Sequence, residues 1–212
     1  MRHPLVIFCA LAATALAAPP VLSRIGEPPV TAGHAPRVDP AALGRLRSGD
    51  VIFLSAPQAL WARIASGYSL PRYRHGHVGM IVEGIDGRPM VVHAGGDPTR
   101  PRAVVRAVTV ERFLEEARSA SLFRMRDARA ARDAGREAMR FARRAAPFDT
   151  DFSLNNGDKL YCSELIWRAM SSALHRDVVP VKASAYARKV VRLRDIETSP
   201  DLVLVAQATA PL

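Results

Sequence analysis

Residues 160–167 read Leu160-Tyr161-Cys162-Ser163-Glu164-Leu165-Ile166-Trp167, and we predict that a helix begins at Cys162. The only other cysteine, Cys9, lies in an N-terminal segment that we expect to be removed. The mature chain would then carry one thiol and no internal disulfide. Far upstream, one apolar strand is expected to begin at His77 and the next to end near His93. A lone cysteine at a helix start together with two strand histidines is typical of thiol hydrolases.

The N-terminus has the pattern of a secretory signal peptide over residues 1–17. Arg2 supplies the positive charge, Leu5 to Ala13 form the apolar stretch, and Ala15-Leu16-Ala17 offers a cleavage site of small residues. The apolar stretch is short and rich in alanine, which argues against a membrane span. We therefore expect a periplasmic or secreted protein, with an uncleaved N-terminal anchor as the alternative.

The rest of the chain fits one globular domain. It has 212 residues in all, of which 49% are hydrophobic and 24% charged. Residues 18–40 are rich in proline, alanine and glycine and predict a linker with little structure. The domain is expected to span residues 41–212, without internal repeats.

The hydrophobic pattern after residue 40 alternates between short strands and a few helices. Asp86-Gly87 predicts a hairpin turn, Thr109 is a candidate helix N-cap, and Pro147 ends the longest helix. The expected strands are 51–54, 77–83, 89–94, 103–108, 120–126 and 201–205, and the expected helices are 59–66, 110–118, 128–146 and 162–175. Together they predict an α+β fold, in which a small antiparallel, barrel-like sheet packs against helices.

The formal net charge of +10 favours anionic partners such as phospholipid headgroups or acidic polymers. Export makes nucleic acid an improbable partner. Along the helix expected at 128–146, five arginines recur at steps of three or four and define an arginine stripe: Arg129, Arg132, Arg136, Arg140 and Arg143. The stripe is either an anion-binding surface of the cell envelope or a solvated face, because Asp133 and Glu137 lie among the arginines.

The candidate site residues can be given chemical roles. Cys162 is the candidate nucleophile, and a helix N-terminus would lower the pKa of its thiol. His77 would take the thiol proton, and His93 would orient His77 through the second ring nitrogen. Backbone N–H groups at the helix start, with the Tyr161 hydroxyl, would hold the developing oxyanion.

Other interpretations of the same residues stay open. Cys162 could be a buried core thiol, and His77 and His93 could be polar residues at strand ends. His75 lies two residues from His77, so a continuous strand would point both to one face, where His75 could compete for the role of base. His175 is expected at the surface or in a helix cap. Cys162, His77 and His93 are also good zinc ligands, although no close ligand pair supports a metal site.

The chain resembles the YiiX/YaeF group of permuted papain-like cysteine hydrolases, within the NlpC-type superfamily. The resemblance covers about residues 47–170 and rests on five segments: Gly49-Asp50-Val51-Ile52-Phe53, His77-Val78-Gly79-Met80-Ile81-Val82, Val91-Val92-His93-Ala94, Phe148-Asp149-Thr150-Asp151-Phe152 and Tyr161-Cys162-Ser163-Glu164-Leu165. It implies a circularly permuted papain-like fold in which the histidine precedes the cysteine. Carried onto this chain, the family roles make Cys162 the nucleophile, His77 the base and His93 the polar third residue.

One of these positions departs from the family. In YiiX relatives the third position is commonly glutamate, so His93 changes the electrostatics of the triad. Asp50 matches a turn residue with a structural role. The cysteine motif of the related lecithin retinol acyltransferase-like enzymes is absent, which argues against that branch.

These observations predict an exported cysteine hydrolase that cleaves an amide bond in a cell-wall peptide or a similar substrate through an acyl-enzyme intermediate. We expect it to need no cofactor and no metal. One alternative is a lipid-directed acyl hydrolase or acyltransferase with the same triad. Another is a non-catalytic envelope-binding protein that uses the arginine stripe.

The signal-peptide interpretation predicts where the mature chain begins. N-terminal sequencing of protein recovered from the cell envelope should start near Ala18, because Ala15-Leu16-Ala17 is the expected cleavage site. Envelope protein that still begins with Met1 would instead identify residues 1–17 as an anchor.

Overall fold

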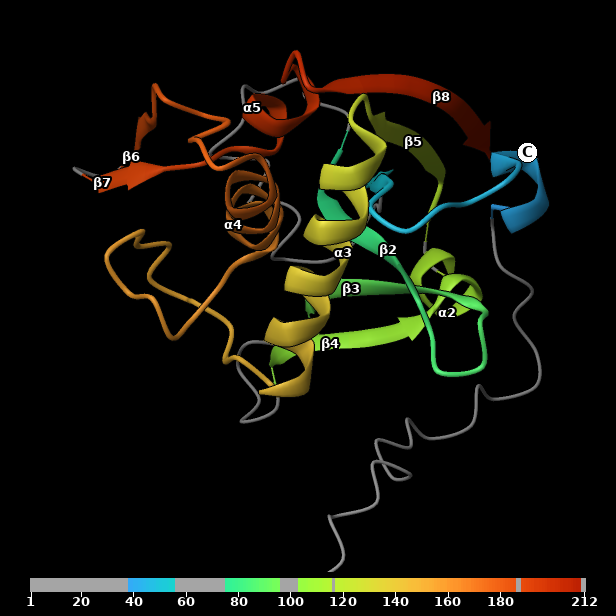
Figure 1. Cartoon of the computed structure of the whole chain (residues 1–212), viewed down its shortest axis with the longest axis horizontal. Coiled ribbons are helices and arrows are strands. Elements are labelled where there is room, and N and C mark those ends of the chain that lie inside the picture. Colours follow the sequence, from blue (N-terminus) through green and yellow to red (C-terminus); the bar gives the residue numbers. More distant parts are fainter. Residues whose placement is uncertain (1–37, 56–74, 96–102, 116, 186–187, 211–212) are drawn as a thin grey trace, which may run out of the picture. The chain divides into compact units, whose positions relative to one another are not determined.

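Short strands in one antiparallel sheet make up the centre of the protein (Figure 1). The computed structural model describes residues 38–55, 75–95, 103–115, 117–185 and 188–210, which all lie in one compact unit of the chain. Its strands are β1 (Val51–Ser55), β2 (His77–Glu83), β3 (Pro89–Gly95), β4 (Val104–Thr109), β5 (Ser119–Met125), β6 (Ala183–Ala185), β7 (Arg188–Val190) and β8 (Leu202–Thr209). Its helices are the 3-10 turn η1 (Pro40–Leu43), α2 (Val110–Leu114), α3 (Ala128–Arg143), α4 (Cys162–Leu174) and α5 (Leu193–Glu197).

Six strands pair in the order β4-β3-β2-β1-β5-β8, and every pair is antiparallel. The strands β6 and β7 form a separate hairpin. The sheet order places β2, which begins with His77, between β1 and β3 at the centre. The α+β class and the antiparallel sheet predicted from the sequence are therefore confirmed.

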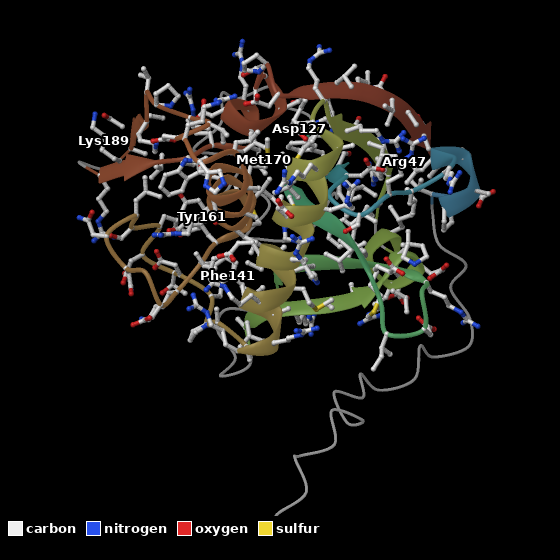
Figure 2. The ribbon with its side chains drawn as sticks, in the orientation of Figure 1. Arg47, Asp127, Phe141, Tyr161, Met170 and Lys189 are labelled. Atoms are coloured by element: carbon white, nitrogen blue, oxygen red, sulfur yellow. The ribbon has the colours of Figure 1, made fainter. Side chains whose placement is uncertain are left out.

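Different helices cover the two faces of the sheet. Helices α3 and α4 pack on the face to which Val78 and Met80 of β2 point. Helix α2 and η1 pack on the opposite face, to which Ile81 and Val91 point. Successive strand residues point to opposite faces, and both faces are buried, so the central strands are apolar at nearly every position. Figure 1 shows α3 passing in front of β2 and β3, and Phe141 of α3 is labelled in Figure 2.

Helix α3 approaches the start of β1 at a contact that requires glycine. Gly49 has a φ of +88°, and a Cβ atom there would lie 2.1 Å from the carbonyl oxygen of Ala131. On the helix side, a Cβ atom at Gly135 would lie 2.5 Å from Oγ of Ser48. The N–H of Gly49 donates to the carbonyl of Ile81 at 2.8 Å, which ties the same turn to β2.

Asp50 holds the turn in place from the other side. Its carboxylate accepts hydrogen bonds from Nε and Nη2 of Arg124 at 2.8 and 2.7 Å and from the N–H of Arg47 at 2.9 Å. Only 1% of Asp50 is exposed, and a buried carboxylate requires partners of this kind. This arrangement agrees with the structural role that the family resemblance implies for Asp50.

Several predicted boundaries hold and others shift. Thr109 caps α2 as expected, because its Oγ1 accepts from the N–H of Arg112 at 3.2 Å. Helix α3 ends at Arg143, before the predicted residue 146, since Ala145 has a φ of 47° and Pro147 follows. Helix α2 is shorter than predicted, and β8 is longer. The short elements η1, β6, β7 and α5 were not predicted, because three to five residues show no clear period.

Some predictions fall on residues that the structure does not describe. They are the signal peptide at 1–17, most of the linker at 18–40 and the helix at 59–66. Within the described ranges, no helix combines the length and the apolarity needed to cross a membrane.

The contact between Gly49 and α3 can be tested with Gly49→Ala. A positive φ costs a non-glycine residue about 1–2 kcal/mol, and the clash with the backbone of Ala131 should add about 1–3 kcal/mol of overpacking. The free energy of unfolding is measured by urea denaturation. Gly44→Ala is the matched control, because Gly44 has a φ of +68° but no atom within 4 Å of the added Cβ. Equal losses in the two variants would show that the approach of α3 does not constrain the turn.

Candidate active site

Cys162 is the first residue of α4 and is buried, with 4% of its surface exposed. Three backbone N–H groups surround its sulfur: those of Cys162 and Ser163 at the helix start, and that of Val78 on β2. The pairing of β2 with β3 ends at Met80 and Val92, and this leaves the N–H of Val78 for the sulfur.

Burial decides the charge of this thiol. It raises the pKa of Cys162 to about 11, although the N–H groups around the sulfur act in the opposite direction. The N–H groups at the helix start lower this pKa in the expected direction, but burial outweighs them and the net shift is upward. Desolvation disfavours the thiolate more than the helix N-terminus and the N–H donors favour it. At neutral pH the resting residue is a neutral thiol.

The residues on either side of Cys162 bind the same distant residue, Val191. The N–H of Val191 donates to the hydroxyl of Tyr161 at 2.9 Å, and Oγ of Ser163 donates to the carbonyl of Val191 at 2.8 Å. All three residues are buried. We call this pair of contacts the Val191 clamp. It fixes the backbone before and after the thiol, and it directs the Tyr161 hydroxyl to Val191.

His77 and His93 are joined by a hydrogen bond of 2.9 Å between Nε2 of His77 and Nδ1 of His93. Both rings pack against Phe113 of α2, with ring centroids 5.5 and 5.2 Å from it. A Cβ atom at Gly95 would lie 2.4 Å from Nδ1 of His93. The His93 imidazole can occupy this position only because residue 95 is glycine. The two histidines thus lie on the α2 face of the sheet.

The environment keeps both imidazoles neutral. Burial, and then the positive charge of Arg106, lower the pKa of His77 to about 4. The pKa of His93 is held well below its ordinary value by burial, by His77 and by Arg106. Arg106 lies opposite His93 in the pairing of β3 with β4. We did not single out Arg106 from the sequence, because only the strand register brings it beside the histidines.

Cys162 and the histidine pair approach the sheet from different sides. Cys162 packs in the core under α3 and α4, whereas His77 and His93 contact Phe113 on the other face. The sulfur reaches the N–H of Val78, the residue that follows His77. Among the described residues, no hydrogen bond joins Cys162 to His77 in this resting arrangement.

His75 does not share a face with His77, contrary to the expectation from a continuous strand. It precedes β2, and its ring packs at 5.4 Å from Phe53, on the α4 side of the sheet. Its Nε2 lies 3.2 Å from Oγ of Ser121, and its Nδ1 lies 3.4 Å from the carboxylate of Glu197. The two histidines therefore have separate partners. His175 lies exposed at the C-cap of α4, as expected.

A buried carboxylate in the first turn of α4 was also missed. Glu164 is fully buried and its Oε1 accepts from Nε of Arg168 at 2.9 Å, whereas its Oε2 accepts no hydrogen bond from the residues that the structure describes. Burial raises the pKa of Glu164 to about 7, although Arg168 acts in the opposite direction. Arg168 also donates to the carbonyl of Leu154 at 3.1 Å, so α4 is tied to the loop that precedes it. The i,i+4 spacing of Glu164 and Arg168 is the signal that could have predicted this pair.

The possible zinc ligands are not arranged as a metal site. Among the described residues, no group of three or more histidine, cysteine, aspartate or glutamate side chains could hold a metal ion. The three residues considered for zinc from the sequence, Cys162, His77 and His93, therefore do not form such a group here.

Comparisons with known proteins identify the family and the fold. Residues 45–196 match the family model described as permuted papain-like amidase enzyme, YaeF/YiiX, C92 family. The structure is similar to the crystal structure of metalloprotein yiiX from Escherichia coli O157:H7, with a TM-score of 0.60 and 21% sequence identity, over 78% of this chain and 98% of that one. A search of curated proteins gives no match.

The neutral resting thiol predicts how Cys162 reacts with iodoacetamide. The reactive species is the thiolate, so the rate should be low at pH 7 and should rise with pH towards the pKa of about 11. Mass spectrometry of the Cys162 peptide measures the rate. The same peptide in urea-unfolded protein is the control and should titrate near a pKa of about 8.5. A fast, constant rate from pH 5 upward would instead indicate a preformed thiolate–imidazolium pair.

Proposed function

Since the chain belongs to the YaeF/YiiX family of permuted papain-like amidases and is a cysteine hydrolase of the amidase or peptidase type, we propose that it is exported and cleaves an amide bond in a cell-wall peptide or a similar substrate. Cys162 is the proposed nucleophile, His77 the base and His93 the residue that orients His77. The observation that carries the proposal is the placement of Cys162, a buried thiol at the start of α4 beside the backbone that follows His77.

The proton transfer follows from the bonds that the histidines make. Nε2 of His77 is engaged with His93, so Nδ1 is the nitrogen that remains for the thiol proton. At neutral pH His77 is uncharged, because its pKa is about 4, and it can accept that proton. In the resting structure the His77 ring and Cys162 lie on opposite faces of the sheet, so the proposed transfer requires the start of β2 to rearrange until Nδ1 reaches the sulfur.

The covalent steps are those of acyl transfer. The sulfur attacks the amide carbonyl as His77 takes its proton, and the tetrahedral intermediate expels the amine, which receives the proton from His77. Water then attacks the thioester, His77 removes a proton from it, and the acid and the free thiol are released. We propose that the N–H groups of Cys162, Ser163 and Val78 hold the oxyanion, because they lie near the sulfur that the substrate carbonyl must approach.

The Tyr161 hydroxyl has a different part in this proposal than in the prediction from the sequence. Because it accepts the N–H of Val191, it helps to place Cys162 through the Val191 clamp. Burial raises the pKa of this hydroxyl, so the group stays protonated throughout the reaction.

A second candidate is the same chemistry on a lipid amide or ester at an anionic surface. The arginine stripe on α3 favours it, since all five of its residues are exposed. Arg136 pairs with Asp133 and Arg140 with Glu137, which reduces the charge available for a membrane. Assays of the purified protein on peptidoglycan fragments and on acyl esters separate the two candidates, because only one class should be turned over efficiently.

Substitutions in the proposed triad should rank by role. Cys162→Ala should abolish turnover, and His77→Ala should reduce kcat by about 10²–10⁴-fold, the usual contribution of a general base. His93→Ala should reduce kcat less than His77→Ala, because water can replace part of an orienting contact. Steady-state kinetics on the substrate found in the assays measures these effects.

His75→Ala is the internal comparison. His75 is 1% exposed and contacts Ser121 and Glu197, so its loss should lower the free energy of unfolding rather than kcat of the folded protein. Turnover that survives Cys162→Ala would remove the proposed mechanism. A stable His75→Ala variant with the kcat of His77→Ala would assign the base to His75.

A further inference from the structure

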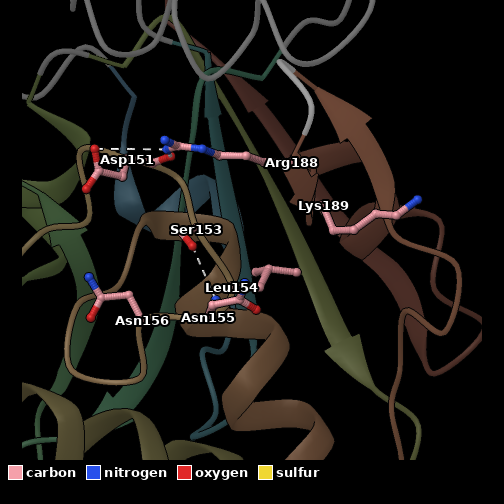
Figure 3. A pocket seen from close by; sticks show the side chains of 7 residues that line it. All are labelled: Asp151, Ser153, Leu154, Asn155, Asn156, Arg188 and Lys189. Carbon is pink, nitrogen blue, oxygen red and sulfur yellow. Dashed lines mark hydrogen bonds and ion pairs between the residues drawn. The ribbon is translucent and has the colours of Figure 1, made fainter.

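A cavity of about 540 Å³ lies between the loop that precedes α4 and the strand β7 (Figure 3). The loop contributes Asp151, Ser153, Asn155 and Asn156, and β7 contributes Arg188. The volume is within the range of about 300–1,000 Å³ that is common for small-molecule sites. Its polar lining offers amide and hydroxyl groups that can bind a peptide backbone.

Three charged residues line this cavity: Arg188, Lys189 and Asp151. Arg188 extends towards Asp151 and donates to its carbonyl oxygen, while the two charged groups remain 4.0 Å apart. The side chain of Lys189 points away from the loop residues in Figure 3, and its Nζ donates to Oγ of Ser184 at 3.0 Å. Because the ion pair with Asp151 is long and exposed, Arg188 can bind an incoming carboxylate with its other N–H groups.

The loop wall of the cavity is held in a fixed shape. The carboxylate of Asp149 accepts from the N–H of Asp151 at 2.9 Å and from the N–H of Ser153 at 2.7 Å. Asp149 is fully buried, which protects these bonds from water. The carbonyl of Leu154 accepts from Arg168, which in turn is bound to Glu164.

Both walls are also connected to the residues next to the thiol. On the loop side, Phe152 packs against Tyr161 with ring centroids 5.1 Å apart. On the strand side, β7 ends at Val190, which packs with the same two rings, and Val191 follows in the clamp. A group bound in the cavity therefore has a defined position relative to Cys162.

We propose that this cavity is a substrate-recognition subsite in which Arg188 binds a carboxylate of the peptide whose amide bond is cleaved. The inference rests on the proposed amidase function and adds a substrate class to it: a peptide amide that carries a free carboxylate. Asn155 and Asn156 would bind the peptide groups next to that carboxylate.

The experiment measures binding without turnover, in the full chain carrying Cys162→Ala. N-acetyl-alanyl-alanine with a free carboxylate is titrated against its carboxamide form, and amide chemical shifts report the site. The free acid should bind at least tenfold more tightly and should shift the backbone signals of Asn155 and Asn156. Arg188→Gln should reduce the affinity for the acid about tenfold and leave the weak binding of the carboxamide unchanged.

Arg194→Gln is the matched control, because Arg194 is an exposed arginine on α5 outside the cavity lining. It should bind the acid like the parent protein. Equal affinity for acid and carboxamide, unchanged binding in Arg188→Gln, or no binding of the acid would each overturn the subsite. Inorganic phosphate that binds in the cavity when the acid does not would also overturn it, in favour of a phosphate ligand. Because no turnover is needed, these outcomes are independent of whether the hydrolase mechanism holds.

Discussion

Two hydrogen bonds with the backbone of Val191 hold the chain on both sides of the Cys162 thiol. Cys162 has little to hold it by itself, since its side chain is small and sits at a helix start that no side chain caps. Tyr161 and Ser163 anchor the chain on both sides of Cys162, because both bind the backbone of Val191. Val191 lies between β7 and α5. These contacts fix the position of the Cys162 sulfur relative to α4, to the loop before α4 and to the segment after β7.

Electrostatics give this site a different resting state from the ion pair that is familiar in papain-like enzymes. Burial keeps the thiol protonated, and burial together with Arg106 keeps His77 unprotonated. A carboxylate at position 93 would favour an imidazolium at His77, whereas the neutral His93 does not. In the proposed mechanism the proton therefore moves only as the sulfur attacks, and no thiolate is formed beforehand.

The sequence predicted those parts of the site that depend on local pattern. His77 and His93 begin and end apolar strands, and the hydrogen bond expected between them is present. The start of α4 at Cys162 was predicted for the same reason. What it could not predict depends on the pairing of distant segments. Arg106 meets His93 only through strand register, and Val191 meets Tyr161 across 30 residues that have no shared period.

The position of His75 shows how a local pattern can mislead. Alternation in a strand would place it beside His77, but β2 begins only at His77, and the N–H of Gly76 donates to Leu54 at the strand entrance. His75 then turns to Ser121 and Glu197, which belong to β5 and α5. The alternation of side chains between the two faces of the sheet therefore starts where the hydrogen bonds between strands start, and the apolar composition does not show that position.

Cys162 and Val191 are far apart in the sequence, so they leave the ribosome at different times during synthesis. A ribosome delivers Cys162 before Val191, and it delivers β8, which pairs with β5, later still. An emerging chain thus carries its nucleophile for some time without the contacts that place it. The contacts that place Cys162 can therefore form only after Val191 has left the ribosome.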